Sequence, residues 1–226
     1  MPGGNILSDP RFANADYTAP DYQVARIRVF IEDNVEEPVE LSSVLTGDQE
    51  VPQGTNSPAI GMSALTLNEM GDALEYDLTV SGLDFWQLLG TEPKTPDTGD
   101  DVTRIHLHDN VRGENGPVAF GLFDLVAPEV GGQDADDLIV VENPDGSVTL
   151  SGIWEETDPA LIPLSEFVDE IQDAEFGDDI GLYWNIHTEE FPGGAIRGQL
   201  QAGDLSGADE IVGVDDNDSI GGGCRQ

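Results

Sequence analysis

All three histidines of this 226-residue chain lie in two short segments whose composition predicts β-strands. His106 and His108 are separated by one residue, and because successive side chains of a strand point to opposite faces, both imidazoles point the same way. His187 lies in the later segment, on the strand face that it shares with Tyr183 and Asn185. Imidazole is a borderline ligand that suits copper and zinc, so the three histidines predict a transition-metal site.

A site with three histidines takes a fourth ligand or keeps one position open. The candidates for a fourth ligand are Asp109, Glu189, Glu190 and water, and the sequence does not choose among them. The pattern is similar to the copper half of copper/zinc superoxide dismutase, but the bridging histidine and the other zinc ligands are missing. Dismutase activity is therefore not expected, and a strongly acidic surface would also repel superoxide. The alternative is that the histidines pack within the sheet and bind no metal.

Five ordered motifs, three of them around or beside the histidines, resemble the CHRD domain, the module named after chordin and widespread in bacteria. The resemblance covers residues 40–202. It implies a secreted or cell-surface all-β domain and, outside chordin itself, no defined biochemical role. The motifs are GDQEVP (47–52), LEYDLTVSGL (74–83), IHLH (105–108) leading into GENGPV (113–118), WNIH (184–187) and PGGAIRGQL (192–200).

The charge of the chain excludes several classes of partner. Lysine and arginine total 8 against 46 aspartates and glutamates, which gives a formal charge of −38. Such a surface repels phosphate backbones and anionic membranes, so we expect no nucleic-acid binding. A salt-rich cell interior, a calcium-rich exterior or export of an unfolded chain would each favour this charge, and cations should stabilise the folded form.

Alternating apolar and polar residues predict an all-β fold, an antiparallel β-sandwich of the immunoglobulin-like or superoxide-dismutase-like Greek-key kind. Leu164, Phe167, Val168 and Ile171 recur at helical spacing and predict one helix over 161–174. A short helical turn is expected at 84–89. The predicted strands are 24–31, 39–45, 61–68, 73–81, 102–108, 118–125, 134–142, 147–154, 181–188 and 195–201.

Three regions are expected: an arm with a leading strand (1–38), the CHRD-like domain (39–202) and an acidic tail (203–226). The tail resembles a short remnant of the glycine- and aspartate-rich RTX repeats that bind calcium, with Asp215, Asn217 and Asp218 as possible ligands. Since such repeats need stacked neighbours, a single copy should bind calcium weakly. The alternative is a flexible acidic tail. Cys224 is the single cysteine, so no intrachain disulfide can form.

No stretch approaches the roughly 20 apolar residues of a membrane span. The N-terminus lacks the basic and apolar regions of a classical signal peptide. We nevertheless expect an extracellular or cell-surface protein, because the family resemblance and the RTX-like tail both favour export. The signal is then either removed or C-terminal, and otherwise the protein stays inside the cell.

Three further residues receive structural predictions. Arg197 follows a Pro-Gly-Gly turn, and we expect it to form a buried or half-buried ion pair that ties loops together. Asn115 precedes Gly116 and is expected to serve a turn. Met62 is expected to fill the core instead of binding copper.

Three hypotheses about function remain open. In the first, the chain is a CHRD-type binding or structural module in which histidines hold copper or zinc and the acidic surface engages calcium. In the second, it is a copper-dependent redox enzyme that uses the same histidines. In the third, it is an extracellular matrix or adhesion component without a transition metal. The sequence does not identify a protein partner or an oligomeric state.

Overall fold

The computed structural model describes residues 37–203, and it confirms the all-β class. Within this range there are nine strands and two short α-helices, α1 (Trp86–Leu89) and α2 (Val168–Asp173). Two 3₁₀ turns lie at Gly47–Gln49 and Leu164–Glu166. The strands are β1 (Val39–Thr46), β2 (Ile60–Leu67), β3 (Ala73–Ser81), β4 (Val102–Asp109), β5 (Val118–Asp124), β6 (Ile139–Glu142), β7 (Val148–Glu155), β8 (Asp179–Thr188) and β9 (Ile196–Ala202).

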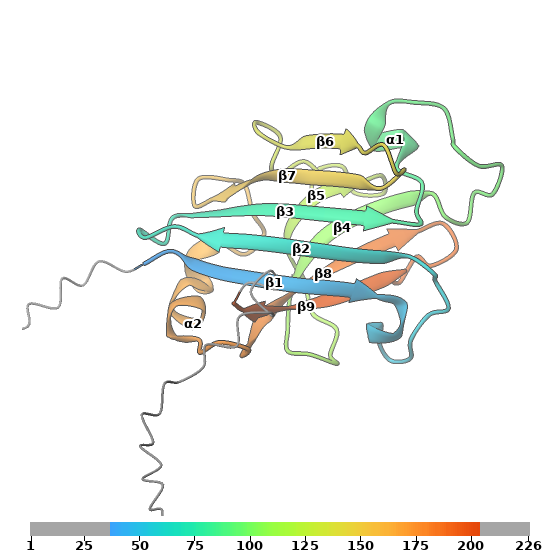
Figure 1. Ribbon diagram of the computed structural model, residues 1–226. Helices are drawn as coiled ribbons and strands as arrows, with labels where there is room; N and C mark the ends of the chain where they lie inside the picture. Colours follow the sequence, from blue (N-terminus) through green and yellow to red (C-terminus); the bar gives the residue numbers. More distant parts are fainter. Residues whose placement is uncertain (1–36, 204–226) are drawn as a thin grey trace, which may run out of the picture. The chain divides into compact units, whose positions relative to one another are not determined.

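The strands form one continuous antiparallel sheet in the order β5-β4-β8-β9-β1-β2-β3-β7-β6. The sheet is curled, so that β1, β2, β3, β7 and β6 form one layer and β9, β8, β4 and β5 lie behind it (Figure 1). The two layers expected from the sequence are therefore halves of a single sheet, joined where β1 pairs with β9.

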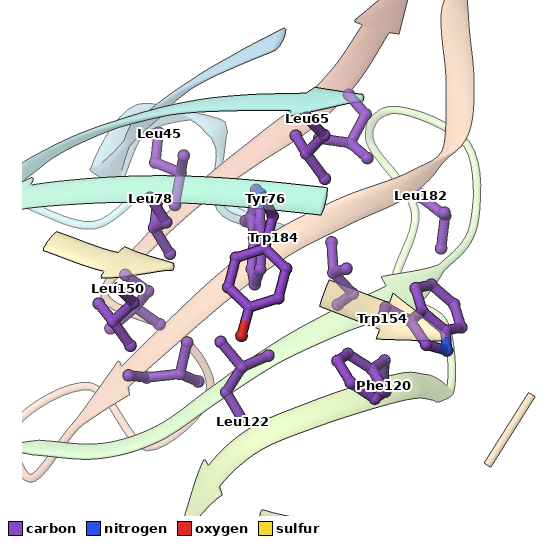
Figure 2. Packing of buried hydrophobic residues seen from close by; sticks show 14 of the residues in the cluster. Leu45, Leu65, Tyr76, Leu78, Phe120, Leu122, Leu150, Trp154, Leu182 and Trp184 are labelled. Carbon is purple, nitrogen blue, oxygen red and sulfur yellow. The ribbon is translucent and has the colours of Figure 1, made fainter. Parts of the chain in front are cut away.

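The hydrophobic core fills the space between the two halves of the sheet (Figure 2). Aromatic rings connect the halves: Tyr76 meets Trp184 edge-on with ring centroids 5.8 Å apart, and Phe120 stacks on Trp154 at 4.8 Å. Alternation along β3 determines which residues enter the core. As predicted, its inward side chains are all buried: Leu74, Tyr76, Leu78 and Val80.

β8 differs from β3 because both of its faces are buried over most of its length. Trp184 and Ile186 point into the core, whereas Asn185 and His187 lie on the opposite face and are also buried. On that outer face, segments 47–58, 110–117 and 189–195 contribute hydrogen-bond partners to the strand residues. The loops thus enclose a layer of polar side chains outside the core.

Several sequence predictions need correction. The single helix over 161–174 is wrong: Leu164–Glu166 form a 3₁₀ turn and only Val168–Asp173 are α-helical. Leu164 and Phe167 are three residues apart, which fits 3₁₀ geometry, whereas Phe167 and Ile171 are four apart and fit an α-helix. The strand over 134–142 is shortened to Ile139–Glu142, because the preceding residues form turns.

The prediction that Met62 fills the core is wrong, since its side chain is 55% exposed on the outer face of β2. The alternation in this strand was correct, but the buried face is the one carrying Leu65 and Leu67. The predicted strand 24–31, the arm and the tail with Asp215, Asn217, Asp218 and Cys224 lie outside the described residues. Among residues 37–203, no helix is long and apolar enough to cross a membrane.

Candidate metal centre

The pairing of β4 with β8 brings the three histidines together. Arg104 lies opposite His187 and His106 lies opposite Asn185, so the imidazoles of both strands share one face of the sheet. The ring centroid of His106 is 5.5 Å from those of His108 and His187, and the latter two are 6.0 Å apart. One nitrogen of each ring lies within 4.8 Å of the others. Three nitrogens at this spacing can coordinate one metal ion.

An oxygen of the protein lies beside one nitrogen of each imidazole, and for His108 and His187 a hydrogen bond to that oxygen fixes the tautomer. His108 Nδ1 lies 3.0 Å from the carbonyl oxygen of Gly116, and His187 Nδ1 lies 3.1 Å from that of Pro192. His106 uses its other nitrogen: Nε2 lies 3.2 Å from Asp124 Oδ2. Since a neutral imidazole has one donor and one acceptor, the two hydrogen bonds leave lone pairs on His108 Nε2 and His187 Nε2. The contact of His106 Nε2 with Asp124 does not have hydrogen-bond geometry, and we assign the proton to Nε2 because the carboxylate lies beside it, which leaves the lone pair on Nδ1. None of the three lone-pair nitrogens has a hydrogen-bond partner among residues 37–203.

Burial keeps these imidazoles neutral. His106 and His187 are only 3% and 6% exposed, and burial lowers the pKa of His106 to about 4 and that of His187 to about 3. Burial also lowers the pKa of His108. At neutral pH all three rings therefore have a lone pair to donate, which is the form that binds a metal.

Gly116 positions His108 from the turn that follows β4. Its carbonyl oxygen accepts from His108, and its N–H donates to the hydroxyl of Tyr183 over 3.0 Å. The Tyr183 ring stacks on the His108 imidazole with centroids 5.1 Å apart. A Cβ at position 116 would collide with the carbonyl group of Asp109, so only glycine can approach the strand this closely.

Arg197 ties the same turn to β9, although the ion pair expected for it is wrong. The side chain is 1% exposed, and its Nη2 donates to the carbonyl oxygens of Glu114 (2.7 Å) and Val111 (3.3 Å). Nη1 lies 3.4 Å from Asn115 Oδ1, and the guanidinium carbon lies 3.4 Å above the Tyr183 ring. Among residues 37–203 its direct partners are thus neutral oxygens and an aromatic face. The Asn115 side chain also donates to the carbonyl oxygen of Val51 over 3.4 Å, and its role in a turn stays a prediction.

The sequence did not identify Glu50 as part of this polar layer. Its buried carboxylate accepts from Asn185 Nδ2 over 3.4 Å, and its other oxygen has no hydrogen-bond partner among the described residues. Burial raises the pKa of Glu50 to about 7, although the positive charge of Arg197 acts against that rise. Gly194, with φ of +132°, permits this approach because a Cβ there would collide with the Glu50 carboxylate.

The raised pKa of Glu50 predicts a pH-dependent loss of stability. Because the folded-state pKa exceeds the usual 4.5, Glu50 favours folding below that value, and this contribution is lost as the pH rises towards 7. Glu50→Gln should therefore reduce the stability difference between pH 5 and pH 8 by about 2 kcal/mol relative to the wild type. Urea unfolding of both proteins at the two pH values measures this, and parallel pH profiles would contradict it.

The candidate fourth ligands are not members of the histidine group. Asp109 follows His108 and points to the opposite face of β4, while Glu189 and Glu190 lie in the turn after β8. Their role as ligands stays a prediction. Asp124, in contrast, was not considered: it reaches His106 because β5 pairs with β4, and a sequence without known strand pairing gives no signal for that contact.

Comparison with known protein families gives a match to one family model. The model described as CHRD domain matches residues 41–200. The match starts in β1 and ends in β9, so it includes the three histidines, Glu50 and Arg197. Searches of curated proteins and of solved structures each give no significant match.

Proposed function

The chain belongs to the CHRD domain family, and within that family we propose that it is a binding module that holds one copper or zinc ion. The ligands are His106 Nδ1, His108 Nε2 and His187 Nε2. The observation that carries the proposal is that one nitrogen of each of the three imidazoles lies within 4.8 Å of the other two.

Two further features support a transition metal over a packing role for the histidines. Each imidazole directs its second nitrogen to a carbonyl or carboxylate oxygen, which is the arrangement that orients metal-bound histidines. If the histidines only packed within the sheet, three buried nitrogens without hydrogen-bond partners would destabilise the folded chain. Nitrogen-only donors select copper or zinc over magnesium or calcium.

The same proposal describes a module that acts outside the cytoplasm, at the cell surface or in secreted form. Burial of His106 and His187 leaves little access for a substrate, which favours holding a metal over turning over a reagent. The charge of −38 attracts calcium to the acidic surface and suits contacts with extracellular protein or matrix partners of opposite charge.

Metal titration of chelator-treated protein tests the proposal. Isothermal calorimetry with Cu²⁺ and with Zn²⁺ should give one site in the wild type and none of comparable affinity in the His106→Ala, His108→Ala double variant. Thr79→Ala, Thr149→Ala is the matched control, because it removes a hydroxyl pair 2.8 Å apart on the other layer of the sheet. Equal metal uptake by the wild type and both double variants would reject the histidine site. Bound copper that is reduced by a reductant and reoxidised by oxygen would favour the redox-enzyme hypothesis over a non-enzymatic binding module.

Asp124→Asn should weaken metal binding while leaving the fold intact. Asp124 Oδ1 accepts from the amides of Val126 and Ala127 at 2.7 and 2.8 Å, and asparagine can keep both contacts. The lost charge beside His106 Nε2 is expected to cost about 10- to 100-fold in affinity. Asp145→Asn is the control, since Asp145 also caps a turn by accepting from the amide of Ser147 but lies far from the site in sequence and sheet order. Unchanged affinity in Asp124→Asn would show that this carboxylate does not orient the ring.

A further inference from the structure

Two buried oxygens without hydrogen-bond partners converge beside one backbone position on the outer face of β8. Asn185 is 2% exposed and Glu50 is 5% exposed, and neither Asn185 Oδ1 nor Glu50 Oε1 has a partner among residues 37–203. A Cβ on Gly194 would collide with both atoms, so the two oxygens face the same small space. On the other side of the pair, Asn185 Nδ2 donates to Glu50 Oε2 over 3.4 Å.

This arrangement forms two hydrogen bonds only when Glu50 carries a proton. A carboxylate can only accept hydrogen bonds, and so can the side-chain oxygen of Asn185, so an ionised Glu50 leaves two acceptors facing each other. Exchanging the oxygen and nitrogen of the amide does not remove the conflict, because the amide oxygen would then face Glu50 Oε2. A protonated Glu50 instead donates from Oε1 to Asn185 Oδ1 while Oε2 accepts from Nδ2, which makes a paired acid and amide.

The groups around Glu50 set the pH range in which it changes charge. Burial raises the pKa of Glu50 to about 7, and the positive charge of Arg197 on β9 opposes this rise. β8 and the turn that follows it face the carboxyl with Asn185 and Gly194, which do not titrate. Arg112, in the turn after β4, contacts the side chain that precedes Glu50 and has its own carboxylate partner on β8. Glu50 therefore changes charge near neutral pH.

The segment that carries Glu50, residues 47–55, also contacts the two turns that orient the histidines. Thr55 Oγ1 donates to a carbonyl oxygen of the turn after β8 over 2.7 Å, and the Val51 carbonyl oxygen accepts from the turn after β4 over 3.4 Å. The same two turns supply the carbonyl oxygens beside the imidazoles of His187 and His108. Movement of residues 47–55 would therefore loosen the loops that enclose the histidines.

We propose that Glu50 and Asn185 form a proton-dependent latch that holds residues 47–55 over the histidine cluster. With Glu50 protonated, the acid–amide pair is closed. Above neutral pH the ionised carboxylate faces the amide oxygen, so the pair weakens and the segment and both turns loosen. A metal ion held by the histidines is then released faster. This last step rests on the proposed metal site, whereas the latch itself does not.

Hydrogen exchange of the metal-free full chain tests the latch. The Thr55 N–H donates to the Gly47 carbonyl oxygen over 2.7 Å, so its protection factor reports how firmly the segment is closed. From pH 6 to pH 8.5 the wild-type factor should fall about tenfold, because the closed form loses its bound proton. Glu50→Gln can donate to Asn185 Oδ1 and accept from Nδ2 at every pH, so its factor should change by less than about twofold.

Glu170→Gln is the matched control for the removal of a carboxylate. Glu170, on α2, accepts from the Gly181 N–H over 2.8 Å and thus binds the start of β8 instead of Asn185. This variant should keep the wild-type pH dependence of Thr55 exchange. A wild-type protection factor that does not change with pH, or an equal fall in Glu50→Gln, would overturn the latch.

Release of bound zinc to an excess of chelator tests the effect on the metal site. Relative to Glu50→Gln, wild-type release should be at least about threefold faster at pH 8.5 than at pH 6. The ratio to Glu50→Gln cancels any acid-assisted release from the histidines. Equal pH dependence in the two proteins would overturn control of the metal by the latch. A chain that binds no zinc would reject the metal site and with it this last step, while Thr55 exchange still decides the latch.

Discussion

Copper or zinc at about a thousand times its dissociation constant is expected to raise the free energy of unfolding by about 4 kcal/mol. The proposed ligands are three imidazoles that converge only in the folded chain, because His106 and His187 come from different strands of the sheet. His187→Ala should abolish nearly all of this gain. Urea unfolding with and without the metal measures the effect in both proteins.

The control separates coordination from simple charge screening. Mg²⁺ at the same concentration and ionic strength should stabilise the wild type and His187→Ala equally, since it does not favour imidazole ligands. His187→Ala also removes one of the two donors to the carbonyl oxygen of Pro192, while Arg104 Nη2 still donates to it, so the metal-free stability should fall by only about 0.5–1.5 kcal/mol. Equal stabilisation of both proteins by copper or zinc would contradict the coordination of the metal by His187.

Arg197→Met is expected to destabilise the chain by about 2–5 kcal/mol, because it leaves two carbonyl oxygens that a buried guanidinium now satisfies without that donor. The carbonyl oxygens of Val111 and Glu114 would lose their donor, and the cation would leave the face of Tyr183. Chemical unfolding at pH 8 measures the loss. A change below about 1 kcal/mol would show that the turn after β4 does not depend on this side chain.

The carboxylate of Glu50 should account for part of that loss. Without Arg197 its charge is buried with no opposite charge acting on it, so Glu50→Gln should recover about 1–2 kcal/mol in the Arg197→Met background. Recovery is expected to be larger at pH 8 than at pH 5, where the folded-state carboxyl is protonated. If the changes in unfolding free energy caused by Arg197→Met and by Glu50→Gln simply add in the double variant, the two charges do not interact.

The sequence predicted features that depend on neighbours along the chain. The bounds of β3 match the predicted strand, because a clean alternation of Leu74, Tyr76, Leu78 and Val80 identifies both the strand and its buried face. The common face of His106 and His108 follows from strand geometry in the same way. The all-β class and the family were likewise accessible from local motifs.

Features that depend on strand order and loop packing were not predictable. Joining of the two layers into one sheet depends on the pairing of β1 with β9, which no local pattern encodes. Asp124 and Glu50 reach the polar layer through tertiary contacts. Asp124 has no distinguishing local pattern among the 46 acidic residues of the chain, and the GDQEVP motif contains Glu50 but does not indicate which residues it contacts. The alternation in β2 predicted its two faces but not that Met62 lies on the uncovered one.

X-ray absorption at the copper or zinc K edge of the loaded full chain tests the metal centre most directly. We predict three imidazole nitrogens at about 2.0–2.1 Å for zinc, with the outer-shell scattering of rigid imidazole rings and loss of one ring in His187→Ala. A shell of oxygen ligands without imidazole scattering, or a spectrum that His187→Ala leaves unchanged, would contradict the histidine site.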